Sequence, residues 1–317
     1  IITQTYPLIG NYGMNSQDYE SDRVWCRGYI VREACAHPSN WRCETTLDQF
    51  LKDQNVIGIQ GVDTRFLTRT IRESGVMNGA ISTEIQPEDK AAVAELMEEV
   101  KAYTIVDAVK TTTCKEPRVY NPEGDIHVAL LDLGCKENIV RCLVKRGCKV
   151  TVVPSFTTAE QLAELNPDGL MLSNGPGDPE ENVEVIAELK KMLGTGIPAF
   201  GICMGHQVTA LAAGASTVKM KYGHRGANQP VTDFATGRTF ITSQNHGYAV
   251  EGDTLPAEMG KVSAVNANDH TCEGVDYTAW NCFTVQFHPE ANGGPKDTEF
   301  LFDRFIDRIK AAKKGEC

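Results

Sequence analysis

The chain has 317 residues, of which 41% are hydrophobic and 23% are charged, and its formal net charge is −11. This length suits two domains, and the composition is typical of a soluble globular protein. The acidic balance and the scattered Lys and Arg residues argue against nucleic acid as a partner. No apolar run approaches the roughly 18 residues that a membrane span needs, so we expect no association with a membrane.

Eleven cysteines are spread along the chain between Cys26 and Cys317, and no Cys-x-x-Cys pair occurs. The odd count and the wide spacing do not fit a disulfide framework. The seven histidines do not lie at metal-ligand spacing from the cysteines, so we predict no metal site in this chain. These features indicate free thiols in a reducing compartment, and we expect a cytoplasmic location.

The first part of the chain combines short β-like runs with two helical segments. A strand is predicted at 55–59, a helix at 63–73 and a further helix at 88–100. A polar tract at 110–125 then supplies the Pro and Gly residues expected of a linker. We therefore predict a smaller mixed α/β domain at 1–122, with a boundary near Asp125.

From residue 127 onward, apolar strands alternate with amphipathic helices. This alternation is typical of βαβ units, which build parallel sheets. A segment rich in β-branched residues and turns follows, and the chain closes with a strand and an amphipathic helix. We predict an α/β domain at 127–313 whose mostly parallel sheet is flanked by helices. The expected strands are 127–134, 148–154, 168–172, 197–202 and 281–287, and the expected helices are 136–147, 182–193, 204 onward and 298–312.

The stretch "FGICMGHQ" places Cys203 between a strand and a helix, with Gly201 and Gly205 on either side. A sharp strand-to-helix turn of this kind is crowded and needs glycine on both sides of the residue that it exposes. The helix N-terminus also favours a thiolate, which is the nucleophilic form. For any one of eleven cysteines an inert core position is the commoner fate, so the interpretation as a nucleophile requires a base nearby.

The stretch "VQFHPE" supplies a candidate base at the end of the last predicted strand. His288 and Glu290 lie two residues apart, so in an extended segment they share a face. The carboxylate can then accept a hydrogen bond from one imidazole nitrogen while the other nitrogen faces the thiol. An ordinary turn is the alternative interpretation of these residues when they are taken alone.

Cysteine chemistry on a carbonyl group also needs hydrogen-bond donors for the oxyanion. The backbone N–H of Met204 is one candidate, and the Gly-rich loop "SNGPGDP" offers a second through Gly177. Phosphate binding is a competing interpretation of that loop, but the spacing and the Lys of a Walker A motif are absent. A plain turn is the structural alternative.

The motifs "SNGPGDP", "FGICMGHQ" and "VQFHPEA", in this order, closely resemble those of the class I, triad-type glutamine amidotransferases. Within that class, "GVDTRFLTR", "LDLGCKENI", "KYGHRGANQPV" and "ITSQNHGYAV" resemble the small, glutaminase chain of carbamoyl phosphate synthetases. The resemblance runs from residue 1 almost to the end. Because the sequence lacks an initiator Met, and such chains begin several tens of residues earlier, we expect a further N-terminal segment with a substrate-contacting serine.

The resemblance implies a role for individual residues. Cys203 would attack the glutamine amide carbon, His288 would act as base and then as acid, and Glu290 would hold the imidazole. Tyr248 stands where the family often has Phe, and His246 is interpreted as structural. The positions that match glutamine contacts are Gly175, Gly177, Met204, Gln207, Asn245, Gly247 and Tyr248.

The resemblance also implies partners. The large synthetase chain would receive the ammonia in a hetero-oligomer, and ATP and a divalent metal are expected on that chain, with no cofactor in this one. Arg65, Arg69 and Arg72 share a helix face, which we interpret as solvated and not as a contact with the large chain.

Other functions remain open at this stage. The chain could be the glutaminase of anthranilate, aminodeoxychorismate or GMP synthesis, although the N-terminal domain argues against these. It could also be another cysteine hydrolase on a related fold. A non-catalytic pseudoglutaminase that regulates a partner is the third alternative, against which the joint presence of Cys203, His288 and Glu290 speaks.

Overall fold

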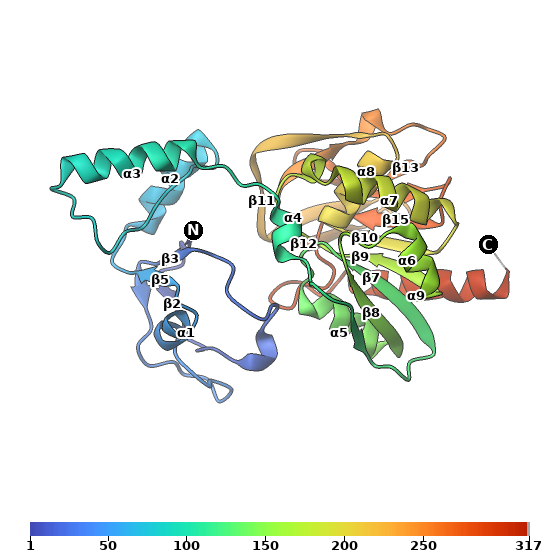
Figure 1. The fold of residues 1–317 in the computed structure, drawn as a ribbon, viewed down its shortest axis with the longest axis horizontal. Coiled ribbons are helices and arrows are strands. Elements are labelled where there is room, and N and C mark those ends of the chain that lie inside the picture. The colour runs from blue at the N-terminus through green and yellow to red at the C-terminus, as the bar shows by residue number, and fades with distance from the viewer. Residues whose placement is uncertain (316–317) are drawn as a thin grey trace. The chain divides into compact units, whose positions relative to one another are not determined.

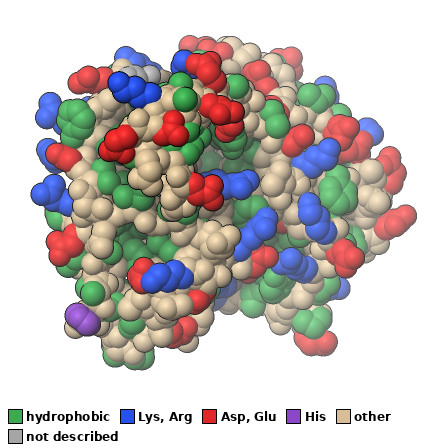
Figure 2. Space-filling model, turned by 60° about the vertical axis from the view of Figure 1, so that its left-hand side comes forward, with side chains coloured by type: hydrophobic (Ala, Val, Ile, Leu, Met, Phe, Trp, Pro, Cys, Tyr) green, Lys and Arg blue, Asp and Glu red, His purple; other side chains and the backbone are tan. Residues whose placement is uncertain are grey.

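The computed structural model describes residues 1–315 (Figure 1). The chain forms two compact units, Ile1–Thr104 and Ile105–Cys317. Within the described residues, no helix is both long and apolar enough to cross a membrane. On the face that Figure 2 shows, acidic and basic side chains are interspersed.

The first unit holds small sheets and three helices around a modest core that includes Val31, Leu47 and Leu51. Asp63 begins the second helix, because its side chain accepts a hydrogen bond from the Phe66 N–H at 3.0 Å. Arg65, Arg69 and Arg72 on this helix are exposed, as expected of a solvated face. The sheets are β1-β3-β5 and β2-β4, both parallel. The bounds are β1 Ile2–Thr3, β2 Leu8–Ile9, β3 Gly28–Ile30, β4 Glu33–Ala34, α1 Leu47–Asp53, β5 Ile57–Ile59, α2 Thr64–Ser74 and α3 Lys90–Ala102.

The second unit begins earlier than the boundary that the polar tract suggests near Asp125. Helix α4 (Ala108–Thr112) and strand β6 (Arg118–Tyr120) both precede that residue, and β6 pairs antiparallel with β8 (Cys148–Pro154). The Thr113 hydroxyl also donates to the Asp132 carbonyl at 2.6 Å. Much of the tract predicted as a linker is therefore part of the second unit, because a strand pairing distant in sequence recruits it.

A ten-stranded sheet forms the centre of the second unit, in the order β12-β11-β13-β14-β15-β10-β9-β7-β8-β6. The five adjacent strands β15, β10, β9, β7 and β8 run parallel. Each of them overlaps a strand that the sequence predicts. The other five pair antiparallel, so the expected mostly parallel sheet describes only the middle. The bounds are β7 Ile126–Asp132, β9 Gly169–Leu172, β10 Ala199–Ile202, β11 Ser216–Asp233, β12 Thr239–Glu251, β13 Lys261–Asn266, β14 Cys272–Tyr277 and β15 Cys282–Val285.

Helices cover both faces of the parallel strands (Figure 1). Successive residues of β7 alternate between the two cores: Leu130 packs on the α5 and α9 side, and Leu131 on the α6, α7 and α8 side. Both faces are apolar, which explains the nearly continuous hydrophobic strands in the sequence. The helices are α5 Glu137–Lys145, α6 Ala159–Glu164, α7 Val183–Gly194, α8 Met204–Ala212 and α9 Phe300–Lys314.

Candidate active site

Cys203 forms a sharp turn between β10 and α8. Its backbone has φ 54° and ψ −101°, a strained conformation for a residue with a Cβ atom. A Cβ atom on Gly201 would lie 2.8 Å from Thr284 Cγ2, and one on Gly205 would lie 2.6 Å from the Leu172 carbonyl oxygen. Both flanking glycines are therefore required by close packing, as the predicted elbow demands.

Backbone hydrogen bonds hold this turn on both sides. The Cys203 N–H donates to the Val285 carbonyl on β15 at 2.8 Å, and the Gly205 N–H donates to the Ser173 carbonyl beyond β9 at 3.0 Å. The Gln207 N–H donates to the Cys203 carbonyl at 3.1 Å and so begins the helix. The surrounding structure thus holds the strained residue in place.

His288 and Glu290 follow β15, the parallel neighbour of β10, so they lie at the same sheet edge as Cys203. His288 Nδ1 lies 2.7 Å from Glu290 Oε1, and the two residues are only 4% and 2% exposed. The His288 N–H also donates to the Ser243 carbonyl on β12 at 2.9 Å. With Nδ1 committed to the carboxylate, the Nε2 atom is available for the thiol.

The pKa values of this buried pair move apart. Burial lowers the pKa of His288, but the charges of Glu290 and Cys203, together with a hydrogen bond to Cys203, outweigh burial and raise the pKa to about 9. Burial raises the pKa of Glu290, but the His288 charge and hydrogen bond outweigh it and lower the pKa to about 2. The site therefore favours a charged imidazolium beside a carboxylate, with Cys203 in hydrogen-bonding contact.

Lys136 and Asn138 were not identified from the sequence as part of the site. Lys136 Nζ lies 3.3 Å from Glu290 Oε1, and the Asn138 side-chain amide donates to the Glu290 carbonyl. The positive charge of Lys136 lowers the pKa of both Glu290 and His288. The available signal was the position of "GCKEN" just after β7, a parallel strand of the same sheet whose end lies at the same sheet edge.

The Gly-rich loop after β9 passes beside the end of β7. A Cβ atom on Gly175 would lie 2.3 Å from the Leu133 carbonyl oxygen, and Gly177 has φ +89°. Asn174 ties the loop down, since its side chain accepts from the Lys136 N–H at 3.0 Å and donates to the Gly134 carbonyl at 3.1 Å. The two glycines permit a tight backbone path whose N–H groups can serve as donors.

Gln207 connects the elbow helix to β12. Its side-chain amide donates to the Tyr248 carbonyl at 2.8 Å and to Gln286 Oε1 at 3.0 Å. The Tyr248 pKa is raised to about 12, first by burial and then by a hydrogen bond to Asp178, which follows the Gly-rich loop. These contacts bring the Gly-rich loop, the elbow helix and β12 together, although they lie far apart in sequence.

The remaining predicted contact residues lie on β12. Asn245 is exposed and Gly247 is half-buried, on either side of the buried His246. His246 Nδ1 lies 2.7 Å from the Tyr248 carbonyl oxygen, and burial lowers the His246 pKa to about 4. His246 is thus held inside the sheet, in keeping with its interpretation as structural.

The fold and the grouping of Cys203, His288 and Glu290 define a class I glutamine amidotransferase domain, and the family model described as glutamine amidotransferase class-I matches residues 129–308. The model described as the carbamoyl-phosphate synthase small chain, CPSase domain, matches residues 1–81. The chain belongs to the family of carbamoyl phosphate synthase small chains. It is 49% identical over 310 residues to the small chain of Archaeoglobus fulgidus, covering 98% of this chain and 86% of the relative. It is 46% identical over 317 residues to that of Listeria monocytogenes, covering 100% and 85%.

A solved structure has a similar fold over part of this chain. A Thermoplasma acidophilum protein described as a GMP synthase subunit superposes with a TM-score of 0.53 at 24% sequence identity. The match covers 60% of this chain and 96% of the other. At this identity the likeness concerns the fold alone.

Proposed function

We propose that this chain is the glutaminase subunit of a carbamoyl phosphate synthetase and that it hydrolyses L-glutamine to glutamate and ammonia. The observation that carries the proposal is the strained Cys203 at the end of β10, with the His288–Glu290 pair at the end of the adjoining parallel strand. Membership of the small-chain family over nearly the whole chain supports the same function.

The reaction proceeds in two halves. The Cys203 thiolate attacks the amide carbon of glutamine, and the C–N bond breaks as His288 transfers a proton to the leaving nitrogen. Ammonia leaves, and a thioester to Cys203 remains. His288 then takes a proton from water, the resulting hydroxide attacks the thioester, and the C–S bond breaks to release glutamate. Glu290 keeps the imidazole oriented and stabilises its charged form in both halves.

The oxyanion of each half is stabilised by backbone donors. We assign this role to the N–H of Met204, the first residue of α8, and to the N–H of Gly177. The substrate itself lies between the Gly-rich loop and β12. The residues proposed to contact glutamine are Gly175, Gly177, Met204, Gln207, Asn245, Gly247 and Tyr248.

The partner of this chain is the large chain of the synthetase. Ammonia is protonated in water and then loses its nucleophilicity, so it must pass to a second active site without entering the solvent. The large chain, with ATP, bicarbonate and a divalent metal, makes carbamoyl phosphate from it. The present chain contributes the glutaminase half and needs no cofactor for it.

Ammonia release from glutamine, measured on the chain alone and with a large chain, tests this function. Release should depend on Cys203, so Cys203→Ala should abolish it, while Cys26→Ala in the first unit serves as the matched control. Release that increases with the carbamoyl phosphate synthetase large chain, and carbamoyl phosphate formed from glutamine, would support the full proposal. Release that does not respond to the large chain would point to another amidotransferase, and binding to the large chain without release would point to a pseudoglutaminase.

A further inference from the structure

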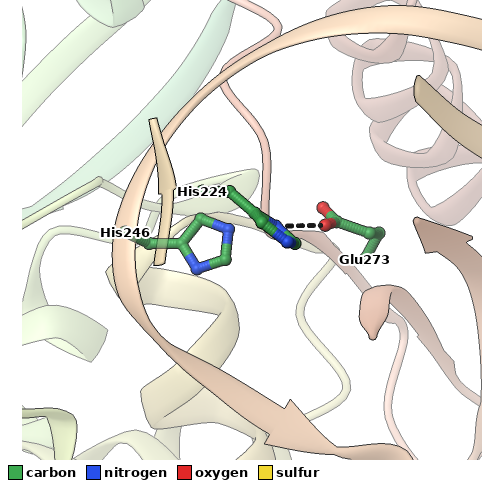
Figure 3. A group of neighbouring side chains, drawn as sticks. All are labelled: His224, His246 and Glu273. Atoms are coloured by element: carbon green, nitrogen blue, oxygen red, sulfur yellow. Dashed lines mark ion pairs between the residues drawn. The ribbon is translucent and has the colours of Figure 1, made fainter. Parts of the chain in front are cut away.

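A buried cluster of potential metal ligands lies beside the proposed glutamine site. It consists of His224 on β11, His246 on β12 and Glu273 on β14 (Figure 3). All three residues are buried, and one ligand atom from each lies within 4.8 Å of the others. None of the three has a part in the proposed catalytic steps.

The hydrogen-bond pattern around His246 leaves one nitrogen without a suitable partner. Nδ1 faces the Tyr248 carbonyl at 2.7 Å, and Nε2 faces Gln244 Oε1 at 2.9 Å. Both of these oxygens can only accept a hydrogen bond, whereas a neutral imidazole has a single N–H. With the proton on Nδ1, the Nε2 lone pair points at another lone pair.

Turning the Gln244 amide over removes this conflict only if Glu273 is protonated. Gln244 Nε2 donates to Glu273 Oε2 at 2.9 Å and contacts Thr242 Oγ1 at 3.1 Å. A reversed amide would place its oxygen against the Glu273 carboxylate, which also only accepts when ionised. With Glu273 ionised, the oxygen of Gln244 is held toward the two histidines.

His224 has the same arrangement as His246. Its Nε2 atom lies 2.8 Å from Asp269 Oδ2, and its Nδ1 atom lies 2.9 Å from Gln244 Oε1 and 3.3 Å from Glu273 Oε1. Nδ1 therefore faces an amide oxygen and a carboxylate, and a zinc ion bound there would take the place of the Nδ1 proton. Two imidazole nitrogens and two oxygens thus lie close together.

The spacing of these atoms suits a tetrahedral ion. Ligands about 2.0 Å from zinc lie roughly 3.3 Å apart along each edge of a tetrahedron. Three of the six separations between the four atoms are 2.9, 2.9 and 3.3 Å, and one ligand atom from each of His224, His246 and Glu273 lies within 4.8 Å of the others. The outer atoms are also arranged as in metal sites, where a ligating histidine donates its second N–H to a carboxylate or a carbonyl. Asp269 and the Tyr248 carbonyl occupy these outer positions.

We propose that His224 Nδ1, His246 Nε2, Glu273 Oε1 and Gln244 Oε1 form a zinc site. The ion would join β11, β12 and β14 next to the segment that carries Asn245, Gly247 and Tyr248. The Asp269 side chain, which contacts His224, is 43% exposed, so only this side chain separates the site from the solvent on that side. The inference concerns a structural site and does not depend on the proposed glutaminase reaction.

Zinc binding by the full chain in a Cys203→Ala background tests the site, because Cys203 and His288 could themselves bind zinc. The protein is stripped with a chelator, dialysed with a phosphine reductant and titrated with Zn²⁺ in a calorimeter. We expect one tight equivalent that raises the unfolding temperature. Glu273→Gln should weaken this binding at least tenfold, whereas Glu258→Gln, at an exposed position of the same unit, should leave it unchanged.

X-ray absorption at the zinc edge of the parent protein identifies the ligand atoms, and this measurement does not require Glu273→Gln to fold. Nitrogen and oxygen scatterers at about 2.0–2.1 Å support the site, whereas sulfur at about 2.3 Å would assign the ion to cysteines. Absence of tight binding in the folded parent would overturn the proposal. So would equal affinity in Glu273→Gln, or nitrogen NMR in the presence of zinc showing protons on both ring nitrogens of His246.

Discussion

His288 Nδ1 and Glu290 Oε1 lie 2.7 Å apart in a part of the protein where both side chains are almost completely buried. Low local polarity strengthens such a hydrogen bond and makes the loss of either partner costly. Because the pair follows β15 while Cys203 ends β10, one parallel strand pairing sets the position of the base relative to the nucleophile.

Replacing Glu290 by Gln should reduce glutamine hydrolysis by about 10²- to 10⁴-fold, because the imidazolium loses its charge partner and its fixed tautomer. The turnover number for ammonia release is the measurement. Glu95→Gln on the exposed face of α3 should retain the parental rate. A Glu290→Gln protein with nearly normal turnover would exclude an orienting role for this carboxylate.

The same pair should make stability depend on pH. The raised His288 pKa contributes stability that is complete below its ordinary value of 6.5 and is lost as the pH rises through about 9. The lowered Glu290 pKa contributes stability that is present above 4.5 and is lost as the pH falls through about 2. The contribution is therefore greatest between pH 4.5 and 6.5.

Urea unfolding followed by circular dichroism at pH 6, 7.5 and 9 measures this contribution. The difference in free energy of unfolding between the parent and Glu290→Gln should shrink as the pH rises toward 9. A difference that stays constant over this range would show that the ion pair is not its source.

Lys136→Met should raise the pKa of His288, because the Lys136 charge opposes protonation of the imidazole. The pKa of Glu290 should rise as well, because the variant lacks the positive charge that stabilises the ionised carboxylate in the parent protein. NMR titration of the His288 ring measures the first change. Lys52→Met, in an exposed ion pair of the first unit, should leave it unaltered, and an unchanged or lowered pKa in Lys136→Met would contradict the assigned contact.

Gly205→Ala should lower the free energy of unfolding by about 1–3 kcal/mol, because the new methyl group would lie 2.6 Å from the Leu172 carbonyl oxygen. The new contact would involve the backbone of both Gly205 and Leu172, and a shift of either backbone would cost free energy. The matched control is Gly194→Ala at the end of α7, where the added carbon would meet nothing within 4 Å apart from its chain neighbours and the backbone of its own helix. Chemical unfolding should give a lower free energy of unfolding for Gly205→Ala than for Gly194→Ala. Equal values would argue against close packing between Gly205 and the Leu172 carbonyl.

Tyr248→Phe should raise the KM for glutamine about 2- to 10-fold with little change in turnover, which corresponds to a lost hydrogen bond of ~0.5–1.5 kcal/mol. The hydroxyl contacts Asp178 and so links β12 to the loop of Gly175 and Gly177. Asp178→Asn should raise KM similarly, and the double variant should add little to either change. Tyr222→Phe on β11 is the control, and a purely additive double variant would show that the two residues act separately.

Local patterns in the sequence predict much of this fold and site. Hydrophobic periodicity predicts the five parallel strands, because each strand is buried on both faces. It also predicts helices α5, α7, α8 and α9, whereas the short helix α6 is not predicted. Glycines on either side of Cys203 predict the elbow, since only a crowded turn requires both. The two-residue spacing of His288 and Glu290 likewise predicts their contact.

Other features depend on pairings between distant segments and are not visible in local patterns. Strand β6 lies inside the tract predicted as a linker and becomes ordered by pairing with β8. Lys136 reaches Glu290 only because the ends of parallel strands share one edge of the sheet.

The cluster of His224, His246 and Glu273 is the strongest example, since nothing in the spacing along the chain indicates that these three residues meet. Each of its residues comes from a different strand, and only the antiparallel half of the sheet brings the three together. Burial periodicity and turn chemistry are local and can be deduced from neighbouring residues. Strand order and register are set by the free energy of the whole packed sheet, which is why the tertiary structure alone decides these contacts.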